Sequence, residues 1–251
     1  MPSVSINAGS WDHLDPASDL LGRVFDRDPA IRYMLCNLSD EEHQEYLQQY
    51  WRGLCRTALL NGAVISEADD WKSAAVVLPP GKSVDNPLMI IPAAFGFLGV
   101  LWRIGLSGLI RMLGEYSGNL NAVKKRALTK QQHYYVFAIG TEYEFQGRGF
   151  AKALMQSLQD EAWRLEVPIW LEATTERSRK LYLSLGFEDV EEVTIGVGKA
   201  AADGTMEIGG QGITLWAMVW WPKPCAVKRN APRQMAMSSI ADLDDLSTSA
   251  A

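Results

Sequence analysis

Two glycines flank an arginine in the stretch YEFQGRGFAKALMQSLQDEA, residues 143–162, directly before a run with helical spacing. Helix starts usually carry Ser, Thr, Asp or Asn as the N-cap, whereas Gly147, Arg148 and Gly149 occupy that place here. The first N–H groups of a helix have no partners within the helix, and the helix dipole adds partial positive charge there. Glycine lets the backbone approach a phosphate closely, and Arg148 and Lys152 add positive charge. The stretch therefore predicts an anion site in which a phosphate replaces the missing cap.

The glycine stretch matches neither of two common phosphate-binding motifs. The chain has no G-x-x-x-x-G-K-[ST] pattern, which excludes a P-loop. It also has no G-x-G-x-x-G with an acidic residue about 20 positions later, which excludes the dinucleotide-binding motif. An ordinary glycine turn with incidental basic residues remains the alternative to an anion site.

Strands and helices alternate around the glycine stretch. HYYVFAIGT (133–141) is aromatic and β-branched with almost no polar residue, as in a central buried strand. The glycine stretch and a helix to about Leu165 follow it. VPIWLEAT (167–174) predicts a second apolar strand, ERSRKLYLSLGF (176–187) predicts a short helix ended by Gly186, and GITLWAMVWW (212–221) predicts a last strand.

The first half of the chain contains a clear amphipathic helix, LSDEEHQEYLQQYWRGLCRTALL (38–60). Ser39 is placed as its N-cap, Glu42 completes a capping box, and Gly62 ends it. GAVISEADDWKSAAVVLPPG (62–81) predicts a hairpin that turns at Asp69–Asp70.

Two further helical segments are predicted nearby. Asp15 or Ser18 could cap a first helix that runs through Phe25, followed by a turn at DRDP. The apolar segment 88–113 predicts one broken helix or two short ones, with the break near Pro92 or Gly99. Its longest uncharged run, 88–102, is shorter than the ~20 residues that cross a membrane.

The composition is that of an ordinary globular protein, with 47% hydrophobic and 22% charged residues among 251. A net charge of −6 argues against nonspecific nucleic-acid binding. Three scattered cysteines indicate reduced thiols in an intracellular protein, and the N-terminus lacks a signal peptide, so we predict a cytoplasmic location without a metal site. The element order predicts one α/β domain over residues 1–223, with a core at 62–220 and a disordered, dispensable tail at 224–251.

The segment QGRGFA, Gln146–Ala151, matches Q-x-x-G-x-G/A, the acetyl-CoA pyrophosphate motif of the GNAT superfamily of N-acetyltransferases. Together with the strands and helices around it, the segment resembles the GNAT core in order and spacing. AAVVLPPG, HYYV, LEAT and LYLSLGF are most similar to puromycin N-acetyltransferase and its fungal and bacterial relatives. The resemblance implies a GNAT fold, in which a central mixed sheet flanked by helices holds acetyl-CoA in a splayed strand pair.

The resemblance also implies roles for individual residues. Tyr182 matches the tyrosine that faces the coenzyme sulfur and protonates the leaving thiolate, and the N–H of Ile139 lies near the acetyl oxygen. Ser178 replaces a common asparagine, and Thr141-Glu142-Tyr143 replaces the commoner V-x-P. The cofactor-binding residues it implies are Ala138, Ile139, Thr141, Gln146, Gly147, Arg148, Gly149, Phe150, Ala151, Ser178 and Tyr182.

Acetyl transfer to an amine also needs a proton acceptor. Glu172 lies in an apolar strand, where burial would raise its pKa, and His133 titrates near neutral pH. Each has a structural alternative: a paired or outward-facing Glu172, and a hydrogen-bonded His133 at the strand start. A chain of water molecules could also accept the proton, so the base stays open.

The leading functional prediction is an acetyl-CoA-dependent transferase that acetylates a primary amine of a small molecule such as a metabolite, toxin or antibiotic, as in detoxification. Trp11, Phe25, Tyr33, Trp51 and the run 95–102 would wall the acceptor pocket. The alternatives are a protein or peptide acetyltransferase and a non-catalytic acetyl-CoA sensor. No nucleic-acid partner and no membrane span are expected, and the chain would be a monomer or homodimer.

Overall fold

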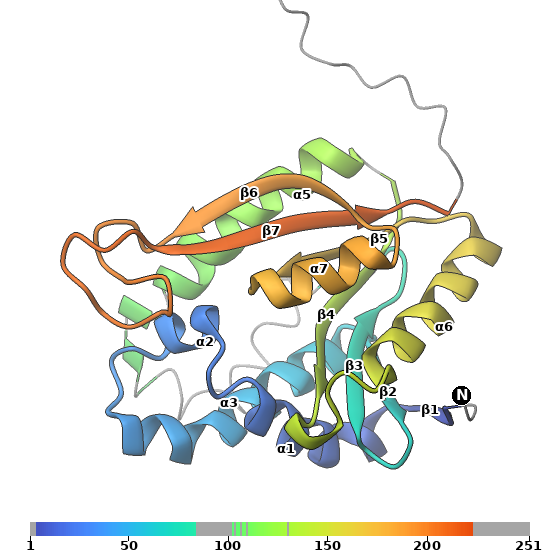
Figure 1. Ribbon diagram of the computed structural model, residues 1–251, viewed down its shortest axis with the longest axis horizontal. Helices are drawn as coiled ribbons and strands as arrows, with labels where there is room; N and C mark the ends of the chain where they lie inside the picture. Colours follow the sequence, from blue (N-terminus) through green and yellow to red (C-terminus); the bar gives the residue numbers. More distant parts are fainter. Residues whose placement is uncertain are drawn as a thin grey trace, which may run out of the picture.

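A seven-stranded sheet with the strand order β1-β2-β3-β4-β5-β7-β6 runs through the molecule (Figure 1). The structure, a computed structural model, describes residues 4–83, 102, 104–105, 107–108, 110–129 and 131–222. Neighbouring strands are antiparallel except β4 and β5, which are parallel. This mixed sheet flanked by helices confirms the predicted fold class. The strands are β1 (Ile6–Gly9), β2 (Val64–Ala68), β3 (Ser73–Leu78), β4 (Tyr134–Thr141), β5 (Ile169–Ala173), β6 (Glu188–Ile195) and β7 (Ile213–Trp220).

Helices cover both faces of the sheet (Figure 1). One face packs against α1 (Leu14–Val24), α3 (Asp40–Leu60) and α5 (Asn119–Leu128), and the other against α6 (Phe150–Leu165) and α7 (Glu176–Ser184). Each face has its own core of fully buried side chains, with Trp170 on the first and Leu171 on the second. Consecutive side chains of β5 therefore point to opposite faces of the sheet and pack in different cores, as the pleat of a strand requires.

The parallel ladder between β4 and β5 is unusually short. Its only residue pairs are Tyr134↔Ile169 and Tyr135↔Trp170, although β4 continues to Thr141 and β5 to Ala173. Beyond these pairs the two strands diverge and leave a wedge between their carboxyl ends. Because α6 and α7 follow β4 and β5 in the chain, both helices begin at this wedge.

The helix predictions hold for extent better than for capping. Ser39 and Glu42 form the predicted capping box of α3. The first helix runs from Leu14 to Val24 as expected, but neither Asp15 nor Ser18 caps it. A 3-10 turn, η1 (Trp11–His13), leads into α1 instead, and the buried Ser18 hydroxyl donates to the carbonyl of Leu14. The hairpin turns at Asp69–Asp70 as predicted, with positive φ at both residues.

The elements that were not predicted include β1, β6, α5, α2 (Pro29–Met34) and the π-helix η2 (Arg111–Gly118). The sequence of β6, EDVEEVTI, is acidic and mostly exposed because β6 is an edge strand, where charge prevents pairing with other chains. Helix α2 is too short to show periodicity, but an aspartate before a proline is a helix-start signal.

Several predictions fall on residues outside those described: the break near Pro92 or Gly99, most of the run 95–102, and the tail 224–251. Among the helices that the structure does describe, none has the length and apolar character needed to cross a membrane. Within the same residues, no group of His, Cys, Asp or Glu side chains could hold a metal ion.

Candidate active site

A cavity of about 820 Å³ lies at the wedge between β4 and β5. On one side it is lined by the end of β4, the loop 142–149 and the starts of α6 and α7; on the other it is lined by the α1–α2 turn, α3 and η2. Its volume falls in the range of about 300–1,000 Å³ that is typical of small-molecule sites. The cavity therefore joins parts of the chain more than a hundred residues apart.

The glycine stretch forms one wall of the cavity. Gly147 and Gly149 have φ of +77° and +92°, in the left-handed region that favours glycine, and Gly149 is the N-cap of α6. A Cβ built on either glycine would meet no described atom within 4 Å, so the loop leaves open space in front of its backbone. No side chain of the described residues caps α6. An uncapped helix start beside open space is suited to an anion.

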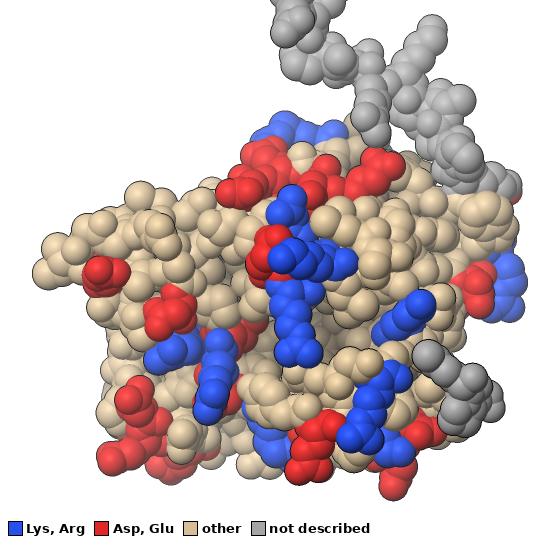
Figure 2. Space-filling view, in the orientation of Figure 1, with Lys and Arg blue, Asp and Glu red and all other residues tan. Residues whose placement is uncertain are grey.

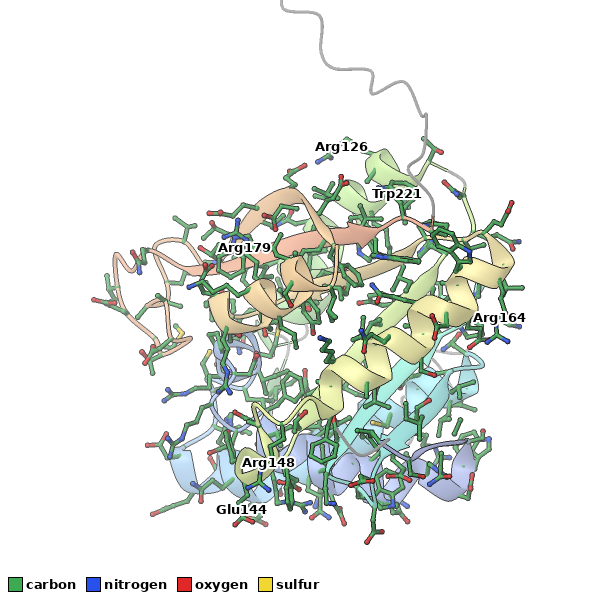
Figure 3. The ribbon with its side chains drawn as sticks, turned by 45° about the vertical axis from the view of Figure 1, so that its right-hand side comes forward. Arg126, Glu144, Arg148, Arg164, Arg179 and Trp221 are labelled. Carbon is green, nitrogen blue, oxygen red and sulfur yellow. The ribbon has the colours of Figure 1, made fainter. Side chains whose placement is uncertain are left out.

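The side chains next to the two glycines make different contacts. The Gln146 side chain donates to the carbonyl of Thr141 at 3.1 Å, which fastens the loop to the end of β4. Lys152 lines the cavity, but Arg148 does not: its guanidinium lies over the ring of Phe145 at 5.3 Å. Figure 3 shows Arg148 and Glu144 at the outer edge of the loop before α6. The expectation that the Arg148 side chain faces the ligand is thus not supported.

The other residues predicted to bind the cofactor lie together. Ser178 sits in the first turn of α7, where its hydroxyl donates to the carbonyl of Thr175 at 2.8 Å and its N–H donates to the Thr175 hydroxyl at 3.2 Å. The serine in place of asparagine thus completes a capping box. The predicted residues that line the cavity are Ala138, Ile139, Thr141, Gln146, Gly147, Gly149, Phe150, Ala151, Ser178 and Tyr182.

A β-bulge in β4 shapes the cavity wall. The register with β3 shifts so that Ala138 pairs with Val76 and Val136 with Val77, which leaves Phe137 without a partner residue in β3. Bulges bend a strand and turn side chains to new directions, and they occur often beside active sites. Here the bend falls where β4 leaves β5, and Phe137 and Ile139 line the cavity.

Tyr182 is buried in the wall formed by α7, and its ring contacts Phe187 at a centroid distance of 5.7 Å. Its hydroxyl makes no hydrogen bond to another described residue. Burial, followed by the negative charge of Asp28, raises the pKa of the phenol. The phenol therefore stays protonated at neutral pH and can donate a proton into the cavity.

Asp28 is a cavity residue that sequence reasoning missed. It lies in the turn before α2, and its carboxylate accepts hydrogen bonds from the N–H groups of Ala30 and Ile31 at 3.0 and 3.1 Å and from the Thr174 hydroxyl. Burial raises the pKa of this carboxyl more than the three hydrogen bonds lower it. The Asp-Pro pair signals a helix start, but nothing in the sequence reveals that the turn reaches the end of β5.

The two predicted bases are in different places. Glu172 lines the cavity and accepts a hydrogen bond from the indole N–H of Trp170 at 2.6 Å. His133 precedes β4, outside the cavity lining, and its ring contacts the carbonyl of Gln131 at 3.0 Å. The structure therefore does not bring His133 together with the other predicted site residues, because the strand begins one residue later and the ring contacts the preceding turn.

Only some of the aromatic residues predicted to wall the acceptor pocket line the cavity. Phe25 and Trp51 line the cavity, where their rings lie 4.6 Å apart. Tyr33 is buried outside the cavity lining, and its hydroxyl donates to Glu115. Trp11 and Trp102 are 50% and 89% exposed, so neither forms the wall.

Comparison with known proteins supports this description. Residues 92–187 match the model of the acetyltransferase (GNAT) family, a segment that contains β4, the glycine loop, α6, β5 and α7. An uncharacterized N-acetyltransferase of Schizosaccharomyces pombe is 21% identical over 178 residues, covering 70% of each chain.

Solved structures share the fold at low sequence identity. The Corynebacterium glutamicum histone acetyltransferase HPA2 and related acetyltransferase is 16% identical with a TM-score of 0.60, over 90% of this chain and 99% of that one. Arylalkylamine N-acetyltransferase 2 of Aedes aegypti is 16% identical with a TM-score of 0.57, over 88% of this chain and 100% of that one. Residues 92–187 are thus similar to the acetyltransferase (GNAT) family, and the chain shares the fold of these solved acetyltransferases.

Proposed function

We propose that this protein transfers the acetyl group of acetyl-CoA to a primary amine of a small molecule. The observation that carries the proposal is the polarity of the cavity, which has an uncapped helix start at one side and two carboxylates, Asp28 and Glu172, at the other. The first side suits a phosphorylated donor, and the second suits a cationic acceptor.

The donor side fits coenzyme A in its backbone geometry. The open space in front of Gly147 and Gly149 would admit a pyrophosphate, and the N–H groups of the first turn of α6 would receive it. The wedge between β4 and β5 would hold the extended arm against strand edges that have no partner strand. When bound, acetyl-CoA supplies the activated thioester.

The acceptor side is aromatic and enclosed. Its carboxylates would attract a protonated amine, and its rings would cover an apolar body. Because the 820 Å³ must accommodate both the donor arm and the acceptor, little room remains for a folded protein substrate. The aromatic residues on this side are Phe25, Tyr50, Trp51, Tyr116, Tyr135 and Phe137.

Two side chains are placed to move protons. Asp28, whose pKa is raised by burial, would accept the proton of the acceptor ammonium. Tyr182, whose pKa is raised by burial and then by the negative charge of Asp28, would donate a proton to the leaving thiolate. Glu172 lines the cavity and accepts a hydrogen bond from the indole N–H of Trp170, and we assign it to holding the acceptor in place.

The names of structural relatives guide the choice of acceptor. One relative is an arylalkylamine N-acetyltransferase, and a Drosophila melanogaster relative with a TM-score of 0.53 and 14% identity is a polyamine N-acetyltransferase. The aromatic lining favours the former type of amine, and the resemblance to puromycin N-acetyltransferase adds antibiotic amines as a hypothesis.

Thiol release from acetyl-CoA over a panel of amines tests the proposed function. The panel should contain aromatic ethylamines, aliphatic diamines, puromycin and a histone-tail peptide, with coenzyme A binding measured alongside. We expect the highest kcat/KM for an aromatic amine. Turnover of the peptide alone would overturn the small-molecule assignment, and binding without any turnover would indicate a sensor.

The Gly149→Glu variant tests the donor side. It would place a side chain and a negative charge where the pyrophosphate is expected, on a residue with a positive φ of 92°. Because a bound phosphate would meet a like charge, we expect at least ~10-fold weaker coenzyme A binding. Calorimetry on the folded variant gives the affinity, with Gly198→Ala, at a positive-φ glycine outside the cavity lining, as a control for backbone strain. Unchanged affinity would show that the loop does not bind the phosphates.

A further inference from the structure

Thr174 is the first residue after β5, and it joins the end of that strand to the turn before α2. Side chains of a strand alternate between the two faces of a sheet, and Trp170 packs in the core on the face of α1, α3 and α5. The same alternation places Glu172 and Thr174 on this face, where α2 also packs. The Thr174 hydroxyl donates to Asp28 Oδ2, so the end of β5 and the start of α2 are joined through the Asp28 carboxylate.

The two oxygens of the Asp28 carboxylate have different contacts. Oδ1 accepts hydrogen bonds from the N–H groups of Ala30 and Ile31 at 3.0 and 3.1 Å and so caps α2. Oδ2 accepts from the Thr174 hydroxyl, which is its only donor among the residues that the structure describes. Because Oδ1 carries both backbone bonds of the cap, Oδ2 is the oxygen that is able to take up a proton.

Four phenols line the same cavity as Asp28, and they come from four different elements. In each of them burial is the main cause of a raised pKa, and the charge of Asp28 contributes to it. The phenols therefore stay protonated at neutral pH and do not titrate together with the carboxylate. They are Tyr50 of α3, Tyr116 of η2, Tyr143 of η3 (Tyr143–Phe145) and Tyr182 of α7.

The cavity lining also contains three cations and a second carboxylate. The cations are Arg27, Lys152 and Arg177. Within the described part of the chain, none of them forms an ion pair with Asp28, which is buried. Figure 2 shows Lys and Arg side chains grouped over α7 at the surface of this face. The second carboxylate, Glu172, accepts a hydrogen bond from the indole N–H of Trp170.

Burial and hydrogen bonding act on Asp28 in opposite directions. Burial raises the pKa of the carboxyl, and the hydrogen bond from Thr174 is the largest of the three contacts that lower it. A hydroxyl that donates to a carboxylate stabilises the charged form. Without this hydroxyl, Oδ2 would be a buried charged oxygen with no donor from the described residues.

We propose that Thr174 is a positioning residue that keeps Asp28 Oδ2 ionised for the removal of a proton from the acceptor ammonium. The role of Asp28 as proton acceptor rests on the proposed function, whereas the contact between Thr174 and Oδ2 does not. In the transfer, an N–H bond of the ammonium breaks and an O–H bond forms at Oδ2. The nitrogen keeps the electron pair with which it attacks the acetyl carbonyl carbon, and Thr174 keeps its own proton.

The pH dependence of kcat for Thr174→Val and Thr174→Ser, with acetyl-CoA and phenylethylamine, tests the proposal. Valine keeps the branched shape and loses the hydroxyl, whereas serine keeps the hydroxyl. Thr174→Ala removes the hydroxyl without a second methyl group and takes the place of Thr174→Val if valine does not fit. The control is Thr205→Val, because the Thr205 hydroxyl donates to the exposed Asp203 carboxylate at 2.6 Å, outside the cavity lining.

The acid limb of the kcat profile should lie about one to two pH units higher in Thr174→Val, the range of a hydrogen bond to a charged group. On the acid limb its kcat should therefore be about 10- to 100-fold below that of the wild type. Above the shifted limb, where Oδ2 is ionised in both proteins, the two kcat values should converge. Thr174→Ser and Thr205→Val should follow the wild-type profile.

Denaturant unfolding as a function of pH monitors Asp28 without turnover. Burial raises the folded pKa of Asp28 above the unfolded value of about 3.9, so the resulting stabilisation is present below the unfolded pKa and is lost as the pH rises through the folded pKa. Because Thr174→Val raises the folded pKa further, its unfolding constant should increase about 10- to 100-fold more than that of the wild type between acid and alkaline pH. This extra increase should be absent when Thr174→Val is combined with Asp28→Asn.

A fall in kcat of Thr174→Val by the same factor at every pH would overturn the proposal, because the hydroxyl would then serve only the fold. Profiles of kcat and of unfolding that both match the wild type would overturn it as well. A shift in the unfolding profile without a shift in the kcat profile would instead overturn the role of Asp28 in the proposed function. A shift in both profiles that Thr174→Ser does not show is the result that we expect.

Discussion

The Asp28→Asn variant is expected to keep its fold and to lose at least ~100-fold in kcat, the lower end of what a positioned base contributes. Asparagine has the shape of aspartate, and its carbonyl oxygen can still accept from the N–H groups of Ala30 and Ile31. Its amide can meet the hydroxyl oxygen of Thr174. The substitution therefore removes the proton acceptor while it retains the contacts that hold the turn.

The Asp28→Asn substitution should lower kcat but should not lower the stability of the fold. Because burial raises the pKa of Asp28, the folded protein binds this proton more tightly than the unfolded chain does. The resulting stabilisation is fully present below the unfolded pKa of about 3.9 and is lost as the pH rises through the folded pKa. Above the folded pKa the wild type carries a buried charge that the variant lacks, so Asp28→Asn should melt there at the same or a higher temperature.

Steady-state kinetics and thermal unfolding of Asp28→Asn and Glu172→Gln at several pH values check both expectations. The melting difference between Asp28→Asn and the wild type should shrink toward pH 4, and wild-type kcat should rise as Asp28 ionises. We expect Glu172→Gln to raise the KM for the amine more than it lowers kcat. If Glu172→Gln instead loses kcat and Asp28→Asn does not, Glu172 is the base and Asp28 only caps α2.

The Tyr182→Phe variant is expected to lower kcat at least ~10-fold, toward the low side of general-acid contributions because water can substitute for the phenol. The ring contact with Phe187 is retained, and the hydroxyl makes no hydrogen bond to another described residue, so packing should change little. The pKa of the phenol is raised by burial and then by Asp28, which keeps the proton available at neutral pH.

Turnover and coenzyme A affinity should be measured together for Tyr182→Phe. Tyr134→Phe is the matched control, since its hydroxyl donates to Glu161 outside the cavity lining. A wild-type kcat would make Tyr182 a packing residue. A fall in kcat with a parallel loss of coenzyme A affinity would show that the tyrosine positions the donor.

The parts of the site that the sequence predicted are those with local patterns. Gly147 and Gly149 lie between a buried strand and an amphipathic helix, so their order along the chain already implies a helix start at a strand end. Tyr182 was placed by family resemblance, on a helix that Gly186 ends as expected.

The parts that were missed depend on contacts that are distant in sequence. Asp28 becomes an active-site candidate only because Thr174 lies beside it, 146 positions along the chain. His133 lies outside the cavity lining because the strand begins one residue after it, and its ring turns back to Gln131. Strand β6 was not predicted because it is an exposed edge strand. Its acidic residues do not alternate with apolar ones, so the sequence lacks the usual pattern of a strand.

The two-pair ladder between β4 and β5 also divides the sheet along the chain. Strands β1 to β4 lie within residues 6–141, and strands β5 to β7 lie within residues 169–220, so each side of the seam is a contiguous piece of sequence. Backbone hydrogen bonds barely join the pieces, and their cohesion depends on the two side-chain cores that cross the seam. The fold therefore consists of two contiguous parts of the chain that are held together mainly by side-chain packing. A molecule bound in the wedge would contact both parts and stabilise their association. Amide hydrogens along the seam should exchange more slowly in its presence.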